Sequence, residues 1–206
     1  SRDAPSLLAA GKKFRQDWLA RWIENPRSFR KQAAMPRLLH GAGSRENARD
    51  IAAWLASLGK PGKAGPAASP EIIKKGGELF ADLGCFNCHT LRKAKAAGAE
   101  GADRISLRNI GEKWRPRALE EFLLDPDRDY KWIRMGDLQL KAPEAGALVA
   151  FLLSLPGDPQ KAQAFKRPPN PALGKELAEK LRCANCHQLA GEKEQADILS
   201  PATNNI

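Results

Sequence analysis

Two short stretches, Cys85-Phe86-Asn87-Cys88-His89 and Cys183-Ala184-Asn185-Cys186-His187, contain all four cysteines and two of the three histidines of the 206-residue chain. A Cys-x-x-Cys-His run is typical of covalent attachment of haem c. Cysteines three residues apart share one face of a helical turn, so both thiols can reach the vinyl groups of one porphyrin while the next histidine reaches the iron. The motifs therefore predict two haem groups. The attaching cysteines are Cys85, Cys88, Cys183 and Cys186, and the iron ligands are His89 and His187.

Zinc binding and dithiol redox chemistry fit these motifs less well. A structural zinc site needs four ligands, whereas each motif offers two cysteines and one histidine, and His40 is far away in sequence. A thioredoxin-like pair follows a strand in a βαβ unit. We expect helix on both sides of each motif, because no β-branched run is present there.

The composition favours helices over sheets, since Ala, Leu, Lys, Arg and Glu are frequent while Val, Thr and Tyr are few. The length suits one or two domains. No apolar run approaches the roughly 18 residues of a membrane span. The N-terminus lacks the charged-then-apolar pattern of a signal peptide, so we expect a mature or trimmed chain without a transmembrane segment.

The formal net charge of +10 has two interpretations. The basic side chains could dock an acidic redox partner, or they could simply form a solvated surface, and haem propionates would offset up to about two charges per haem. Nucleic-acid binding is not expected, because Lys and Arg are dispersed and no nucleic-acid motif is present.

An internal repeat organises the chain. Residues 6–15 and 106–115 share Ser, Leu, Gly, Lys and Arg at an offset of one hundred, and the match continues to Met35 and Met135. After a three-residue slip, residues 51–58 align with 148–155. The N-terminal segment thus repeats the half that follows the first haem motif.

The C-terminal segment repeats the opposite half, because residues 174–189 match 76–91 at an offset of ninety-eight. The chain therefore reads as a back half, a whole module and a front half. The predicted divisions are a split or circularly permuted module from 1–58 plus 171–206, a linker at 59–70, a continuous module at 71–156 and a Pro-rich linker at 157–170.

Three kinds of helix are expected in these modules. The first kind leads into a haem motif, at about 71–84 and 171–182, and its Gly76 or Gly174 allows another helix to cross closely. The second is a middle helix that ends before Pro26 or Pro126. The third is the last helix, at 45–58 or 144–155, which presents an apolar face to the first. The middle helices are expected at about 15–24 and 116–124.

The only two methionines, Met35 and Met135, occupy the same repeat position in the loop between the middle and last helices. Methionine often fills gaps in cores, but this coincidence favours sixth iron ligands. A thioether opposite histidine leaves no open coordination site, which suits electron transfer. His40 could replace Met35, although the repeat has no matching histidine and an exposed loop residue is the simpler interpretation.

The order of elements in each reconstructed module resembles that of class I cytochromes c: an N-terminal helix, the haem motif, a middle helix, a methionine loop and a C-terminal helix. The resemblance implies an all-α fold with two modules, each around one covalent haem with His/Met-ligated iron and a partly exposed edge. One departure is the family's Gly-Pro-x-Leu, which is replaced by Pro5-Ser6-Leu7 and Ile105-Ser106-Leu107. The carbonyl that orients each histidine is therefore not placed by the sequence.

The two chain ends are complementary, so we expect them to fold together, with His187 and Met35 on one iron. Two alternatives are a swap of halves between neighbouring chains, which in an open form builds a filament, and a fragment of a longer array.

The predicted function is that of a dihaem electron-transfer cytochrome without catalytic residues, either a free shuttle between redox proteins or a subunit of a larger respiratory complex. The alternative is a haem enzyme, of the dihaem peroxidase or thiosulfate-oxidising type, with one open or displaceable axial site. Covalent haem implies, by family analogy, a location outside the cytoplasm, usually the bacterial periplasm.

Overall fold

The computed structural model describes residues 4–31, 33–59, 62, 65, 68–91, 104–128, 133–157 and 167–189. Apart from two strands of two residues each, the regular elements in this part of the chain are helical. The predicted all-α fold is confirmed.

The elements fall into three runs along the chain. The first run contains α1 (Ala10–Lys13), α2 (Gln16–Glu24), the 3-10 turn η1 (Pro26–Ser28) and α3 (Ser44–Ser57). The second contains α4 (Pro70–Asp82), η2 (Cys85–Asn87), β1 (His89–Thr90), β2 (Ile105–Ser106), α5 (Ile110–Lys113), α6 (Pro116–Leu124) and α7 (Ala142–Ser154). The third contains α8 (Pro171–Lys180) and η3 (Cys183–Asn185).

Local sequence signals set the ends of these helices. Ser69 caps α4, because its hydroxyl accepts a hydrogen bond from the amide of Ile72. Pro70 occupies the first turn, where its missing N–H removes no hydrogen bond of the helix. The middle helices α2 and α6 end before Pro26 and Pro126, as predicted.

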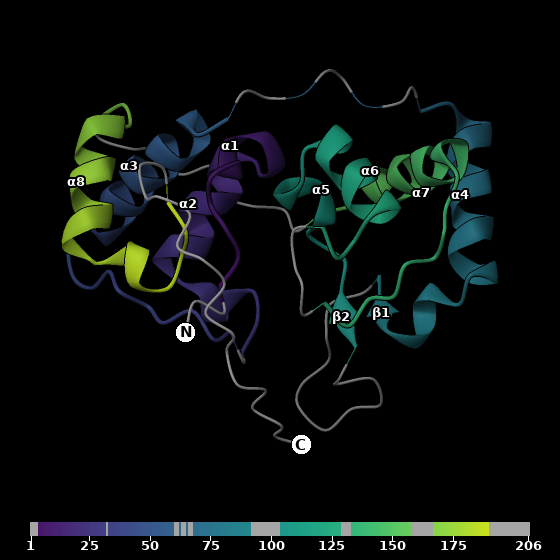
Figure 1. Ribbon diagram of the computed structural model, residues 1–206, viewed down its shortest axis with the longest axis horizontal. Helices are drawn as coiled ribbons and strands as arrows, with labels where there is room; N and C mark the ends of the chain where they lie inside the picture. The colour runs from purple at the N-terminus through teal and green to yellow at the C-terminus, as the bar shows by residue number, and fades with distance from the viewer. Residues whose placement is uncertain are drawn as a thin grey trace.

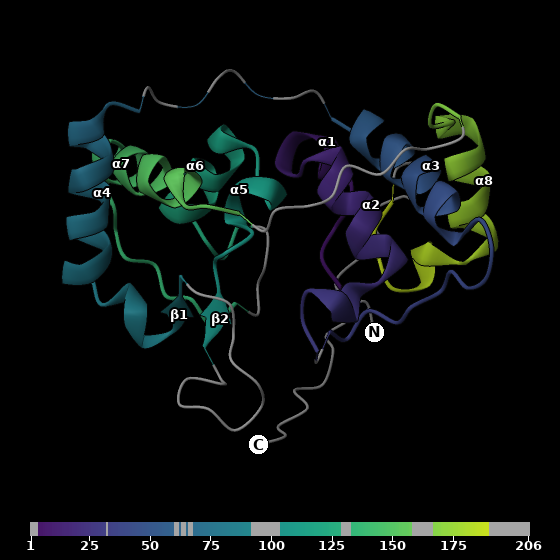
Figure 2. The same ribbon diagram turned by 180° about the vertical axis from the view of Figure 1, so that it is seen from behind.

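The helices that lead into the motifs cross the last helices, as predicted. The helix α4 packs on α7, and α8 packs on α3, although α3 and α8 are far apart in sequence (Figures 1 and 2). A Cβ atom added to Gly76 would collide with the carbonyl oxygen of Ala147, and one added to Gly174 would collide with that of Asp50. Ala147 and Asp50 are equivalent in the repeat, so both crossings use the same backbone contact and both require glycine.

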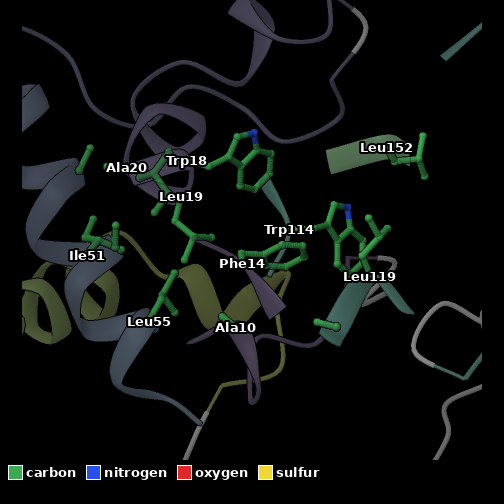
Figure 3. Close-up of a cluster of buried hydrophobic side chains, with 14 of the residues drawn as sticks. Ala10, Phe14, Trp18, Leu19, Ala20, Ile51, Leu55, Trp114, Leu119 and Leu152 are labelled. Atoms are coloured by element: carbon green, nitrogen blue, oxygen red, sulfur yellow. The ribbon is translucent and has the colours of Figure 1, made fainter. Parts of the chain in front are cut away.

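Buried aromatic and aliphatic side chains from the first two runs meet in one cluster. Figure 3 shows Phe14 beside Trp114, with Trp18 of α2 and Leu119 of α6 nearby. Phe14 and Trp114 are equivalent in the repeat and are 6% and 5% exposed. The hydrophobic core therefore continues from the first run of helices into the second.

Two local details differ from the sequence expectations. The cysteine motifs form 3-10 turns after a left-handed residue, rather than a continuation of the helix, since Gly84 and Arg182 have φ values of +69° and +55°. The flank after the first motif is also not helical, because His89 and Thr90 pair in parallel with Ile105 and Ser106. This pairing joins residues that are far apart in sequence, which local propensity does not register.

Candidate functional site

Each cysteine motif is positioned by the end of a helix and a reversal of the chain. After α4, Leu83 and the left-handed Gly84 redirect the backbone into η2, and the Cys88 amide donates to the Cys85 carbonyl at 3.3 Å. After α8, the left-handed Arg182 does the same, and the Cys186 amide donates to Cys183 at 3.2 Å. The two motifs are therefore built in the same way.

None of the four cysteines forms a disulfide in the described residues, and their exposure follows the repeat. Cys85 and Cys183 are half-buried, whereas Cys88 and Cys186 are exposed. Burial raises the pKa of the Cys85 and Cys183 thiols. Each motif thus offers one thiol at the base of the turn and one that is open to solvent.

A backbone carbonyl within hydrogen-bond distance of Nδ1 orients the ring of each motif histidine. His89 Nδ1 lies 3.3 Å from the carbonyl oxygen of Ile105, and His187 Nδ1 lies 2.9 Å from that of Pro5. Ile105 and Pro5 are equivalent in the repeat. With Nδ1–H donating to a carbonyl, Nε2 keeps its lone pair for a metal. These are the carbonyls that the sequence alone does not place.

A second pair of equivalent hydrogen bonds supports each histidine. The Leu107 amide donates to the Thr90 carbonyl at 2.8 Å, and the Leu7 amide donates to the Gln188 carbonyl at 2.9 Å. In the first motif both partners belong to one continuous segment, whereas in the second they come from opposite ends of the chain. Pro5 lacks an N–H, so the bond from the Ile105 amide to the Cys88 carbonyl has no counterpart there.

Burial also changes the pKa of His89, the histidine of the first motif. It lowers the pKa of His89, and the hydrogen bond to Ile105 opposes this effect. The neutral imidazole is the form that ligates a metal.

The two methionines lie in equivalent bends and are half-buried against the core. Met35 Sδ accepts a hydrogen bond from Trp22 Nε1 at 3.1 Å. The residue equivalent to Trp22 is Phe122, which has no N–H to donate. The assignment of Met35 and Met135 as iron ligands stays a prediction, and so does the pairing of each with a histidine. His40 is exposed, with Nε2 at 3.1 Å from the Arg37 carbonyl oxygen.

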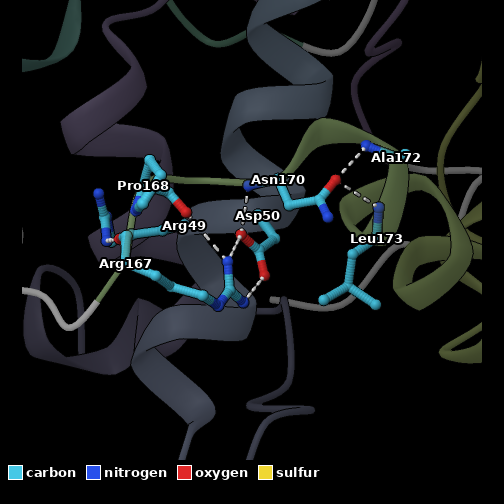
Figure 4. A network of polar contacts seen from close by, with 7 residues as sticks. All are labelled: Arg49, Asp50, Arg167, Pro168, Asn170, Ala172 and Leu173. Carbon is cyan, nitrogen blue, oxygen red and sulfur yellow. Dashed lines mark hydrogen bonds and ion pairs between the residues drawn. The ribbon is translucent and has the colours of Figure 1, made fainter.

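A buried ion pair that the sequence did not reveal fastens α8 to α3 (Figure 4). Asp50 is fully buried, and both of its carboxylate oxygens accept hydrogen bonds from the Arg167 guanidinium. The Asn170 amide donates to the same carboxylate at 2.7 Å, and the Asn170 side chain caps α8 by accepting from the amides of Ala172 and Leu173. Burial raises the pKa of Asp50, but these contacts outweigh it and the net shift is downward. The only sequence signal was an acid at the repeat position of Ala147.

Apolar side chains stand exposed beside the motifs and in the methionine loops. Phe86 and Ile105 are 42% and 50% exposed, and Leu38 and Leu138, which are equivalent in the repeat, are 38% and 37% exposed. The exposed Phe86 and Ile105, beside the cysteines and the oriented imidazole of the first motif, suit contact with a flat apolar cofactor.

The described part of the chain has neither a cluster of metal-binding side chains nor a membrane-spanning helix. Its His, Cys, Asp and Glu residues do not form any group of three or more that could hold a metal ion, as a zinc site would require. None of its helices is long and apolar enough to cross a membrane.

Comparison with known proteins gives one family. The cytochrome c family model matches residues 73–156. The comparisons with curated proteins and with solved structures give no match. The matched segment begins in α4, includes the motif Cys85–His89 and ends just after α7. Residues 73–156 thus match a cytochrome c domain, and the chain has an all-α, cytochrome c-like fold. The match supports a haem-based electron-transfer role in general.

Proposed function

We propose that this protein is a dihaem c-type cytochrome that transfers electrons between redox proteins. The observation that carries the proposal is the equivalence of the two histidines. In each motif, Nδ1 faces the carbonyl oxygen of the same repeat position, Ile105 or Pro5. A motif without a cofactor would have no need for an imidazole held in this orientation.

The residues of each motif fit haem c. The thiols attach the porphyrin, and the oriented imidazole offers Nε2 to the iron. The exposed Phe86 and Ile105 are suited to contact the apolar ring. When bound, haem supplies a one-electron carrier, and the protein holds, orients and insulates it. We propose Met35 and Met135 as the sixth ligands, because they share one repeat position.

We further propose that residues 1–58 and 171–206 form one split module around the second haem. Three contacts support closure within one chain. They are the approach of His187 to Pro5, the hydrogen bond from Leu7 to Gln188, and the crossing of α8 over α3 at Gly174. Each has a counterpart inside the continuous module at 71–156. On this basis His187 and Met35 serve one iron.

The proposed partners are redox proteins, including ones with an acidic docking surface that complements the net charge of +10. With such partners the protein would act either as a free shuttle or as a subunit of a larger respiratory complex. Because covalent haem c is attached outside the cytoplasm in this family, we propose a periplasmic location.

The test is a haem count combined with a redox titration. Pyridine haemochrome spectra and intact mass should give two haems per chain, and one haem each in Cys85→Ala/Cys88→Ala and in Cys183→Ala/Cys186→Ala. Visible and near-infrared spectra should show methionine ligation at both irons, and Met35→Ala should remove it only from the haem of the second motif. One haem per chain would refute the dihaem proposal. Binding of carbon monoxide or peroxide to one iron at neutral pH would favour the haem enzyme instead.

A further inference from the structure

The first and second runs of helices meet along a contact with two-fold pseudosymmetry. Phe14 and Trp114 form an antiparallel bridge at its centre, and their rings lie 5.1 Å apart. The Arg15 amide donates to the Lys113 carbonyl and the Arg115 amide to the Lys13 carbonyl, both at 2.9 Å. Every partner in this set is the repeat equivalent of another member. Contacts in such reciprocal pairs define an isologous interface.

The side chains of the equivalent Arg15 and Arg115 also cross the contact, although they donate to carbonyls that are not equivalent. Arg115 Nε donates to the Gly11 carbonyl at 2.8 Å, and Arg15 Nε donates to the Trp114 carbonyl at 3.3 Å. The middle helices lie on either side of the centre, and each carries one residue of an ion pair across the contact. We call this contact the two-fold surface. It comprises Lys12, Phe14, Arg15 and Arg21 on one side and Glu112, Trp114, Arg115 and Glu121 on the other.

The two sides of the two-fold surface carry opposite charges at equivalent positions. Lys12 pairs with Glu121 at 2.8 Å, and Arg21 pairs with Glu112 at 2.6 Å. Lys12 is the repeat equivalent of Glu112, and Arg21 is the equivalent of Glu121. The N-terminal segment therefore has a base at both positions, and the continuous module has an acid at both.

Two like copies of either side of the two-fold surface would bring equal charges together. If two N-terminal segments met through the two-fold surface, Lys12 would face Arg21 twice, and if two continuous modules met, Glu112 would face Glu121 twice. The aromatic centre would tolerate either arrangement, since it is Phe14 on one side and Trp114 on the other. The ion pairs are partly buried, with exposed fractions of 21–42%, so solvent screens them incompletely. Specificity in such a contact comes from the repulsion in the wrong pairing.

We propose that the two-fold surface is a docking interface that selects a partner of opposite charge, here the continuous module of the same chain, and rejects a like module from a second chain. This inference does not depend on haem. It explains how a chain with two similar modules can dock them on each other while avoiding the pairing of two like modules through the same surface.

The test reverses the charges in the full-length chain. The all-basic variant is Glu112→Lys/Glu121→Arg, and the all-acidic variant is Lys12→Glu/Arg21→Glu. Each should undock its own modules, which raises the radius of gyration in small-angle scattering and lowers the thermal midpoint by about 4–8 °C. The fourfold variant that combines all these changes should restore the wild-type radius, although Glu121→Arg also removes the ion pairs of Glu121 with Arg117 and Arg128.

Sedimentation of a mixture of the two variants tests the charge selection directly. Each variant alone should sediment as a single chain, whereas an equimolar mixture of all-basic and all-acidic chains should form a species of two chains. The matched control is Glu78→Lys/Glu179→Arg, which makes the same change in net charge on exposed positions of α4 and α8. The control should keep the wild-type radius. An all-basic variant with the wild-type radius, a fourfold variant that stays undocked, or a mixture without a two-chain species would each overturn the proposal.

Discussion

At the scale of single residues, the two proposed methionine ligands differ in one neighbour. Trp22 donates its indole N–H to Met35 Sδ, whereas Phe122 occupies the equivalent position near the other methionine loop and has no donor. A hydrogen bond to sulfur withdraws electron density from it, so that the thioether donates less to oxidised iron. Two otherwise similar sites would then differ in reduction potential.

Trp22→Phe should therefore lower the reduction potential of the haem that we propose is attached through Cys183 and Cys186. A hydrogen bond worth about 1 kcal/mol corresponds to a shift on the order of 40 mV for one electron. A spectroscopic redox titration measures the shift, and the haem attached through Cys85 and Cys88 should keep its potential. Trp54→Phe, which removes another half-buried tryptophan, serves as the control. An unchanged potential in Trp22→Phe would contradict a role for this hydrogen bond.

The Lys113 side chain is partly buried among aromatic rings next to the two-fold surface. Its Nζ lies 5.0–5.5 Å from the ring centres of Phe14, Trp18 and Trp114. Burial, with a smaller contribution from Arg30, lowers the pKa of Lys113 to about 8. The ring faces favour the charged form and so oppose the effect of burial.

This pKa predicts a stability that rises with pH. The unfolded chain keeps the lysine proton up to about pH 10.5, while the folded chain releases it near pH 8. Between these values the unfolded state binds more protons, so the free energy of unfolding increases, by up to about 3 kcal/mol. Urea titrations at pH 7, 9 and 10 should show this rise in the wild type relative to Lys113→Met. Parallel pH profiles for the two proteins would show that Lys113 titrates as in the unfolded chain.

At the scale of elements, two helix crossings use glycine in the same way. Gly76 meets the carbonyl of Ala147, and Gly174 meets that of Asp50. These crossings could be predicted from the sequence, because a glycine recurs in each helix that leads into a motif, and the matching last helix has an apolar face. The prolines and caps likewise predicted the ends of the middle helices.

Gly76→Ala and Gly174→Ala should each push two helices apart and destabilise one module by at least about 2 kcal/mol. Gly76→Ala should act on the continuous module and Gly174→Ala on the module we propose for the chain ends, so each should perturb the spectrum of a different haem. Differential scanning calorimetry and haem spectra provide the measurement. Gly136→Ala, where an added Cβ meets nothing within 4 Å, should be neutral. Similar effects on both haems from either substitution would contradict two separate modules.

The contact between α3 and α8 has a polar anchor, Asp50, whose equivalent in the contact between α4 and α7 is Ala147. Asp50 could not be recognised from the sequence, because an acid in an amphipathic helix is ordinarily exposed. Only the path of residues 167–170 in space brings Arg167 and the Asn170 amide to it. The position is alanine in the repeat.

Asp50→Ala should therefore convert this crossing to the apolar form and cost about 1–3 kcal/mol, since Arg167 is 40% exposed and can return to water. The downward shift of the Asp50 pKa means that its contribution is present above pH 3.8 and is lost as the pH falls below it. Acid titration followed by circular dichroism should show a smaller loss of stability in Asp50→Ala than in the wild type. Equal acid sensitivity would indicate that other carboxylates dominate.

At the scale of the whole molecule, the order of segments along the chain differs from their order in space. The repeat offsets predicted that the chain ends are complementary, and the structure brings Pro5 to His187 and α8 to α3. The two-fold surface was not predictable in this way. Its residues are ordinary in the sequence, and the opposite charges at equivalent positions carry meaning only once the two copies face each other.

Cleavage of the linker between α3 and α4 tests how the segments are held. A protease site in place of residues 62–65 allows the folded full-length protein to be cut into an N-terminal and a C-terminal piece. The N-terminal piece should stay bound, because α3 packs on α8 and the two-fold surface holds α1 and α2 against α5 and α6. Sedimentation should give one species with the mass of a single uncut chain, which separates only in denaturant. Adding Gly174→Ala should weaken this association, while Gly136→Ala should not. A mass of two or more chains before cleavage would point to exchange of halves between neighbours, and release of the N-terminal piece on dilution would show that the chain ends do not close on each other.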